Sequence, residues 1–196
     1  MVQLTENEKK ALLILFKDFT SYHNANSLSK TLNISRVGSM KLLKKLKAKE
    51  ILITKTIGKS TVYKINIKND YVIDLIAFLL TEEANNFKRW KEEFKELFTN
   101  NRIILFYGSA IKDYSKARDI DLMIIRKSGE SGKIHKIINK KQQMLPKKIH
   151  AIDLTLQEFL DNVHNEQAAI IDIIKNAIVL YGQYKYVELL KNVASI

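Results

Sequence analysis

The sequence has 196 residues, of which 46% are hydrophobic, and it contains no cysteine. A chain of this length can bury one sizeable core or two small ones, and the lack of cysteine excludes disulfides, thiolate catalysis and cysteine-bound zinc. The net charge is +12, and residues 1–70 carry 14 Lys or Arg against 5 Asp or Glu. This asymmetry indicates that the N-terminal part meets a polyanion, although a generally lysine-rich surface would give the same count.

The N-terminus carries no apolar segment of the kind that directs secretion. The longest apolar run, residues 71–80, is interrupted by Asp74 and is too short to span a bilayer. We therefore expect a soluble protein located in the cytoplasm.

The first 70 residues show the pattern of three helices followed by a β-hairpin. Thr5 and Glu8 form a capping box ahead of an amphipathic helix. A short helix is expected over residues 27–32, and a third over residues 36–49 would bury Val37, Met40, Leu43 and Leu46. Residues 51–67 alternate on both sides of Gly58-Lys59, which predicts a hairpin. This succession resembles the winged helix-turn-helix DNA-binding domains of archaeal regulators.

The resemblance implies that the third helix enters the major groove of double-stranded DNA. Base contacts would then come from the N-terminal end of that helix, near Arg36, Ser39 and Met40. The other expected DNA contacts are lysines of its outer face and of the hairpin tip, most of them to phosphates: Lys41, Lys44, Lys45, Lys47 and Lys59. A merely solvated basic face, or a module for dimerisation, would show the same pattern.

Residues 71–99 read as a helical linker between a winged helix domain (residues 1–70) and a second domain (residues 100–196). Phe87, Trp90, Phe94 and Leu97 recur at helical spacing, which indicates packing in a core or between domains. No Pro- or Gly-rich stretch separates the two domains. We expect the linker to contribute to a homodimer.

The central stretch, residues 102–126, contains two expected strands joined by a turn and a short polar connection. The first strand ends in Gly108-Ser109, and the second begins at Asp119 and Asp121. Residues two apart on a strand share a side, so both carboxylates point together and require a positive partner. Hard oxygen ligands favour Mg²⁺, and a turn that can approach phosphate next to metal-binding carboxylates is typical of phosphoryl or nucleotidyl transfer. Ordinary surface polarity is the alternative.

Gly108-Ser109, nine further residues and Asp119-Ile120-Asp121-Leu122 together resemble the signature of the polymerase β-type nucleotidyltransferases, in particular the minimal nucleotidyltransferases. The resemblance implies an α+β fold with a mixed sheet flanked by helices, and a C-terminal helix near residues 170–182. It also implies a third carboxylate, Asp153, on a later strand.

On this resemblance, Asp119, Asp121 and Asp153 would hold two Mg²⁺ ions. A nucleoside triphosphate (NTP) would bind at four positions of the central stretch: Gly108, Ser109, Lys112 and Arg118. A hydroxyl of a protein, a nucleic acid end or a small molecule would attack the α-phosphate and expel pyrophosphate. His150 is expected to be structural, because it faces away from Asp153 on the same strand.

The central stretch departs from the family pattern at two positions, with Asp113 in place of glycine and Arg118 where serine often stands. An acidic side chain on the phosphate path opposes a polyanion. Two alternatives therefore accompany the transferase hypothesis. One is a DNA-binding regulator whose transferase-like domain is inactive or senses a nucleotide, and the other is an antitoxin-like transferase that modifies a toxin.

Overall fold

The computed structural model describes residues 3–191 and residue 193, and the chain divides into two compact units. The first unit ends at Leu79 and the second spans Leu80–Val193, so the division falls inside helix α4 (Asp70–Ala84). The rest of the expected linker is also helical: η1 (Asn85–Phe87), α5 (Lys88–Glu93) and η2 (Lys95–Leu97). In the described part of the chain, none of the helices is both long and apolar enough to cross a membrane.

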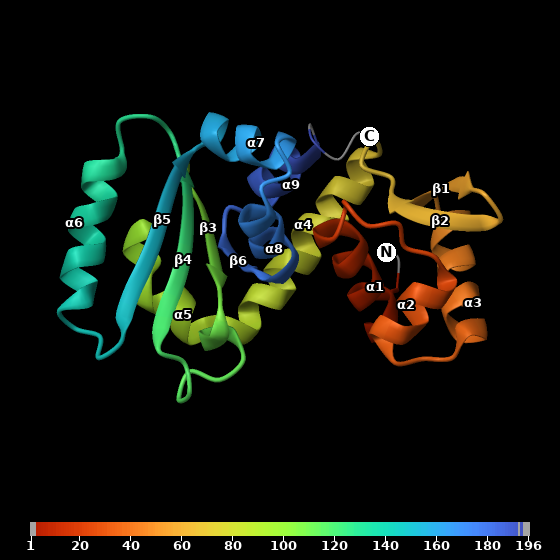
Figure 1. Ribbon diagram of the computed structural model, residues 1–196, viewed down its shortest axis with the longest axis horizontal. Helices are drawn as coiled ribbons and strands as arrows, with labels where there is room; N and C mark the ends of the chain where they lie inside the picture. Colours follow the sequence, from red (N-terminus) through yellow and green to blue (C-terminus); the bar gives the residue numbers. More distant parts are fainter. Residues whose placement is uncertain (1–2, 192, 194–196) are drawn as a thin grey trace. The chain divides into compact units, whose positions relative to one another are not determined.

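The first unit consists of three helices and a two-stranded hairpin, followed by the first turns of α4 (Figure 1). In chain order these are α1 (Glu6–Lys17), α2 (Ala25–Leu32), α3 (Arg36–Ala48), β1 (Leu52–Ile57) and β2 (Ser60–Ile65). The strands are antiparallel and joined by the two residues between Ile57 and Ser60, as expected. The order of elements is that of a winged helix-turn-helix.

Side-chain caps decide where the first helices begin. Thr5 and Glu8 form the expected capping box at the start of α1. Helix α2 starts two residues earlier than predicted, because the Asn24 side chain accepts hydrogen bonds from the backbone N–H groups of Asn26 and Ser27.

The second unit contains a four-stranded mixed sheet in the order β5-β4-β3-β6. Its strands are β3 (Ile103–Tyr107), β4 (Asp119–Arg126), β5 (Lys148–Thr155) and β6 (Ile178–Tyr181). Strand β4 is antiparallel to β3 and parallel to β5. A parallel neighbour requires a crossover, which α6 (Ser131–Gln142) provides. The α+β fold class is therefore confirmed in both units.

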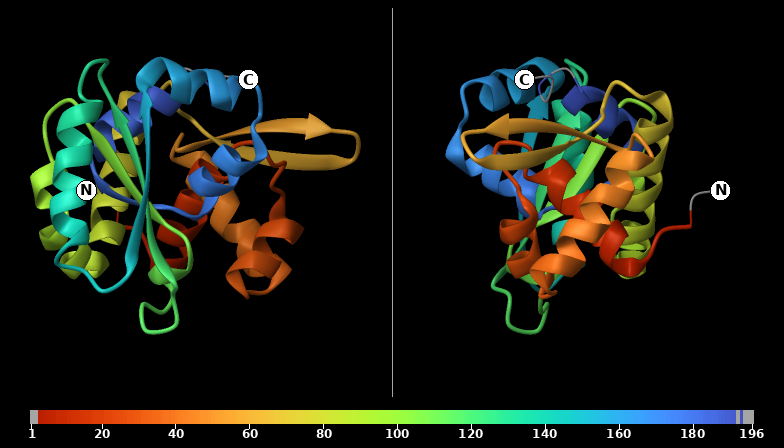
Figure 2. Two further views of the ribbon diagram at one scale, coloured as in Figure 1. Left: turned by 60° about the vertical axis from the view of Figure 1, so that its left-hand side comes forward. Right: turned by 90° about the vertical axis from the view of Figure 1, so that its right-hand side faces the viewer.

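Helices cover both faces of this sheet (Figures 1 and 2). Helices α5 and α6 lie on one side, where Trp90 stacks on Phe94 and also contacts Phe106 of β3. The linker aromatics thus belong to a core. On the other side lie α7 (Leu156–His164), α8 (Ala168–Asn176) and α9 (Gln183–Lys191).

The expected C-terminal helix near residues 170–182 is confirmed only in its first part. Helix α8 ends at Asn176, and Ile178–Tyr181 form strand β6, which pairs antiparallel with β3. A short, buried apolar run fits a helix and a buried strand equally well by pattern alone. Here the residues form a strand because they pair with the edge of β3 that β4 leaves free.

Candidate functional site

The site is built where β3 ends and β4 begins. Ile120 and Leu122 are fully buried, while Asp119 and Asp121, which alternate with them, are only partly covered. This alternation confirms that the two carboxylates share the opposite side of the strand from the buried residues. Tyr107, the last residue of β3, lies directly across from Asp121.

Gly108 brings the turn into contact with the carboxylate pair. Its φ is +79°, a conformation that glycine adopts without strain. A Cβ atom at this position would overlap Oδ2 of Asp121 and lie 2.9 Å from its Cγ. Only glycine therefore fits, and the turn that begins with Ser109 lies against the side of β4 that carries the two carboxylates.

His150 lies beside Asp119 and Asp121, a placement that the sequence did not predict. It lies opposite Asp121 in the parallel pairing of β4 and β5. Its Nδ1 is 3.1 Å from Oδ2 of Asp119 and 3.7 Å from Oδ1 of Asp121. One atom from each of the three residues lies within 4.8 Å of the others, a grouping able to hold a metal ion. His150 is therefore a member of the same candidate metal-binding group as Asp119 and Asp121.

Asp153, the expected third carboxylate, does not lie next to Asp119 and Asp121. It lies opposite Ile124, three positions further along β5 from His150 and on the other side of the strand. Its carboxylate accepts hydrogen bonds from Nε of Arg126 at 2.5 Å and contacts Nε2 of His135 at 3.1 Å. Burial acts to raise the pKa of Asp153, but Arg126 and its other partners outweigh it and hold that pKa below its ordinary value. The expected third carboxylate is thus an ion-pair partner at the far end of the strands.

Negative charge accumulates at the site. Burial and the neighbouring charge of Asp119 raise the pKa of Asp121, and His150 only partly offsets this. Burial together with Asp121 and Asp119 also raises the pKa of Tyr107 to about 12. Such a field favours a cation, and two carboxylates with one imidazole form a chemically suitable donor set for a divalent metal ion.

The loop between the turn and the carboxylates is held by the residue that precedes β5. Lys147 donates hydrogen bonds to the backbone carbonyls of Tyr114, Ser115 and Ala117. Asp113 hydrogen-bonds to its own loop. Its carboxylate accepts hydrogen bonds from the backbone N–H and the hydroxyl of Ser115, at 2.9 and 2.6 Å. The acidic residue that departs from the family pattern therefore stabilises the loop itself.

The two expected basic nucleotide contacts are exposed. Lys112 lies near the start of the loop and Arg118 at its end, directly before Asp119.

Residues 87–181 match the family model described as a nucleotidyltransferase domain, and this range includes all four strands of the sheet. This part of the chain is thus similar to nucleotidyltransferase domains. No curated protein matches the sequence.

Several solved structures are similar to about half of the chain. A mutant of Lactococcus lactis ZitR is 18% identical over 50% of this chain and 65% of its own, with a TM-score of 0.38. A second ZitR mutant, in complex with DNA, is 18% identical over 49% of this chain and 66% of its own, with a TM-score of 0.37. The same protein, described as a zinc-responsive MarR family member, gives 20% identity over 50% of this chain and 66% of its own, with a TM-score of 0.35. The chain thus covers slightly less than two thirds of each structure.

The close approach of Gly108 to Asp121 gives a direct test of the turn. Gly108→Ala should weaken metal and nucleotide binding at least about tenfold, because the added methyl group must displace Asp121. Calorimetric titration measures this loss. Gly129→Ala is the matched control, since Gly129 has a φ of +81° with nothing within 4 Å of the added carbon. Equal effects of the two substitutions would show that backbone strain, rather than contact with Asp121, is responsible.

The candidate nucleic-acid face of the first unit is rotated relative to the prediction. Leu42, Leu43 and Leu46 of α3 are buried, whereas Val37 is 56% exposed and Met40 is 40% exposed. Ser39 is fully buried, so it cannot reach a base edge as predicted. The basic side chains expected on this face are exposed: Arg36, Lys41, Lys44, Lys45, Lys47 and, in the hairpin turn, Lys59.

Lys45 differs from the other basic residues of α3 because it neutralises a buried carboxylate. Its Nζ lies 2.7 Å from Oε1 of Glu8, whose side chain is only 4% exposed. Burial acts to raise the pKa of Glu8, but hydrogen bonds from Lys45 and Thr5 outweigh it and lower that pKa. The pair therefore stabilises the fold above the unfolded-state pKa of Glu8, and this contribution is lost as pH falls through the lower, folded-state pKa.

Lys45→Ala should therefore lower the free energy of unfolding at neutral pH by about 1–2 kcal/mol, because a buried charge loses its partner. Urea titrations at pH 7 and in the acid range measure this, and the difference from wild type should shrink in acid. The exposed Lys44→Ala is the control and should leave stability nearly unchanged. A Lys45→Ala variant as stable as wild type at pH 7 would contradict the assigned role.

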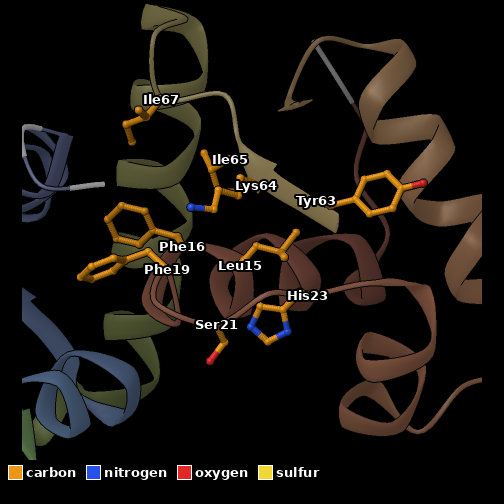
Figure 3. Close-up of a pocket in the computed structure, with 9 residues that line it drawn as sticks. All are labelled: Leu15, Phe16, Phe19, Ser21, His23, Tyr63, Lys64, Ile65 and Ile67. Atoms are coloured by element: carbon orange, nitrogen blue, oxygen red, sulfur yellow. The ribbon is translucent and has the colours of Figure 1, made fainter. Parts of the chain in front are cut away.

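A recess in the first unit lies between α1 and β2 (Figure 3). Its lining is mostly apolar and contains no carboxylate: Leu15, Phe16, Phe19, Ser21, His23, Tyr63, Lys64, Ile65 and Ile67. Nε2 of His23 lies 3.0 Å from Oδ2 of Asp18. The recess offers no group of charges comparable to the exposed face of α3 or to the carboxylate site.

Proposed function

We propose that the second unit transfers a nucleoside monophosphate from an NTP to a hydroxyl acceptor in a reaction that depends on a divalent metal ion. The observation that carries the proposal is the contact of Gly108 with Asp121. It joins a turn suited to phosphate with a carboxylate pair suited to a metal ion. The match of residues 87–181 to the nucleotidyltransferase domain supports the same assignment.

In this proposal each residue of the site has a distinct role. Asp119 and Asp121 hold the metal, for which the family resemblance implies Mg²⁺. The metal supplies neutralisation of the triphosphate charge and polarisation of the α-phosphate. The backbone of Gly108 and the hydroxyl of Ser109 bind the β- and γ-phosphates, and Lys112 and Arg118 provide further positive charge. Asp153 has no part in metal binding, because Arg126 occupies it.

The reaction itself is an in-line displacement. The acceptor oxygen forms a bond to the α-phosphorus, the bond to the β-phosphate oxygen breaks, and pyrophosphate leaves while the acceptor proton passes to a base. Positioning and charge neutralisation supply most of the rate in this class of reaction.

Label transfer tests this function and identifies the class of acceptor. Each NTP, labelled at the α-phosphate, is incubated with the full chain, a divalent metal and one acceptor class: DNA or RNA ends, proteins of a cell extract, or small hydroxyl compounds. We expect metal-dependent incorporation with one acceptor class, together with pyrophosphate release. Labelling of a single protein partner would favour the hypothesis of an antitoxin-like transferase that modifies a toxin. Absence of label in every arm, with a folded protein, would contradict the proposal.

We also propose that the first unit binds double-stranded DNA through α3 and the hairpin turn. The favouring observation is the exposed face of α3, where Lys41 and Lys44 accompany Val37 and Met40. Lysines contact phosphates, and exposed apolar side chains can contact the methyl groups of thymine in the major groove.

The regulator alternative makes a different prediction for the two units together. A nucleotide-sensing domain would change the affinity of the chain for DNA when NTP and metal bind, without turnover. A transferase would consume NTP whether or not DNA is present. Measuring both quantities in one mixture separates these functions.

A further inference from the structure

We propose that His150 is a direct metal ligand and that it makes the site prefer Mn²⁺ to Mg²⁺. The inference rests on the proposed function, since it concerns the metal of the same site, but it departs from the all-carboxylate, magnesium-binding set that the sequence suggested. The relevant donors are Nδ1 of His150, Oδ2 of Asp119 and Oδ1 of Asp121.

The first argument is geometric. All three donors project from two adjacent parallel strands, β4 and β5, so their separation is set by the sheet and not by a mobile loop. An ion with bonds of about 2.1–2.2 Å keeps adjacent ligand atoms roughly 3 Å apart and opposite ones about 4.3 Å apart. The observed Nδ1 distances of 3.1 and 3.7 Å, within a group spanning 4.8 Å, require only a small adjustment around an ion.

The second argument comes from the charges. Asp119 and Asp121 are held close together on a partly buried strand start, and His150 is the ionisable side chain that both of them contact. The carboxylate that sequence reasoning offered as third ligand, Asp153, is bound to Arg126 and His135 on the other side of β5. Among the described residues, His150 is therefore the third donor of this group.

The third argument concerns metal chemistry. Mg²⁺ prefers an all-oxygen octahedral shell, whereas imidazole nitrogen favours transition metals. Mn²⁺ accepts carboxylate and phosphate oxygens as readily as Mg²⁺ does, and it also tolerates an imidazole. Of these two ions, Mn²⁺ therefore fits better than Mg²⁺ a site with two carboxylates, one imidazole and positions left for triphosphate oxygens.

The test must separate metal ligation from a simple hydrogen bond between His150 and Asp119. His150→Asn places an amide N–H close to the position of Nδ1, so it can keep the hydrogen bond but removes the imidazole ligand. His150→Asp supplies a hard oxygen ligand instead. His164→Asn makes the same chemical change at an exposed histidine of α7 and is the matched control.

Calorimetric titration of MnCl₂ and of MgCl₂, without nucleotide, into the full chain gives the main readout. We expect wild type and His164→Asn to bind Mn²⁺ at least about tenfold more tightly than Mg²⁺, since an imidazole ligand contributes selectivity of this order. His150→Asn should lose about 10–100-fold in Mn²⁺ affinity with little change for Mg²⁺. His150→Asp should shift the preference toward Mg²⁺.

Pulsed electron paramagnetic resonance of the Mn²⁺-loaded protein provides a second, activity-independent readout. A directly bound imidazole couples ¹⁴N to the metal, so the signal should be present in wild type and absent in His150→Asn.

Failure of the inference about His150 can be distinguished from failure of the proposed function. If His150→Asn keeps full Mn²⁺ affinity while Asp121→Asn loses it, then His150 is not a ligand but the carboxylate site and the proposed function stand. If Asp121→Asn also binds both metals as wild type does, the carboxylate site itself fails, and the proposed function fails with it.

Discussion

Asp121→Asn should abolish metal-dependent nucleotide binding, with a loss of at least about 100-fold, because the substitution removes the carboxylate that lies between the turn and β5. Asp121 is the Cα partner of both Tyr107 and His150 and is in contact with Gly108, so it is the centre of the site. Removing a charged ligand from a partly buried metal site costs far more than removing a surface charge.

In the metal-free protein, the same substitution should increase the stability of the fold. Burial and Asp119 raise the folded-state pKa of Asp121 above its unfolded value. A raised carboxyl pKa stabilises the fold fully only below the unfolded-state pKa, and this contribution is lost as pH rises through the folded-state pKa. At neutral pH the ionised group therefore costs stability, and Asp121→Asn should melt at a higher temperature than wild type.

Thermal unfolding with and without NTP and metal measures both effects at once. Saturation at about 100 times the dissociation constant stabilises wild type by roughly 2.7 kcal/mol, which should raise its melting temperature, while Asp121→Asn gains nothing. Asp74→Asn, at an exposed position of α4, should behave as wild type. A ligand-induced shift of wild-type size in Asp121→Asn would contradict the assignment.

Lys41→Ala combined with Lys44→Ala should weaken binding to duplex DNA by about tenfold or more at low salt and flatten its salt dependence. Both lysines are exposed on the outward face of α3. Each lost phosphate contact reduces the slope of log affinity against log salt by about 0.9, so the double variant should lose about 1.8. Lys45 is left in place because it holds Glu8.

Fluorescence anisotropy over a series of salt concentrations measures the slope. Lys133→Ala with Lys136→Ala removes the same charge from exposed positions of α6 in the other unit and should leave the slope unchanged. Equal losses in both double variants would indicate non-specific attraction by the net charge. An unchanged slope after the α3 substitutions would exclude α3 as the docking element.

Local patterns were sufficient for most of the helices and strands and for the carboxylate pair, but not for strand β6. The capping box at Thr5, the hairpin turn at Gly58 and the alternation around Ile120 each depend on neighbours in sequence. The apposition of Gly108 and Asp121 also follows, because two strands joined by a short connection tend to pair.

The third metal donor could not be found in this way. His150 and Asp153 lie three apart on one strand and face opposite sides, as the sequence indicated, but which side faces Asp121 depends on the register between β4 and β5. That register is set by packing of α6 against the sheet and by contacts such as that of Lys147 with the loop. The sequence nevertheless contained one indication that His150 points away from the core, since Lys148 and His150 alternate with the apolar Ile149.

The error at Ser39 has a similar cause. Apolar residues occur on more than one side of α3, so the helical phase was ambiguous from Val37 and Met40 alone. In the structure the side with Leu42, Leu43 and Leu46 is buried, and it carries Ser39 inward.

The most direct test of the transferase proposal is calorimetric titration of the four NTPs into the wild-type chain, in the presence of Mn²⁺, of Mg²⁺ and of a chelator. The proposal predicts one binding event per chain for at least one NTP that requires the metal and disappears in chelator. Absence of binding by a folded protein, or binding of equal strength in chelator, would contradict a metal-dependent nucleotidyltransferase site at Asp119, Asp121 and His150.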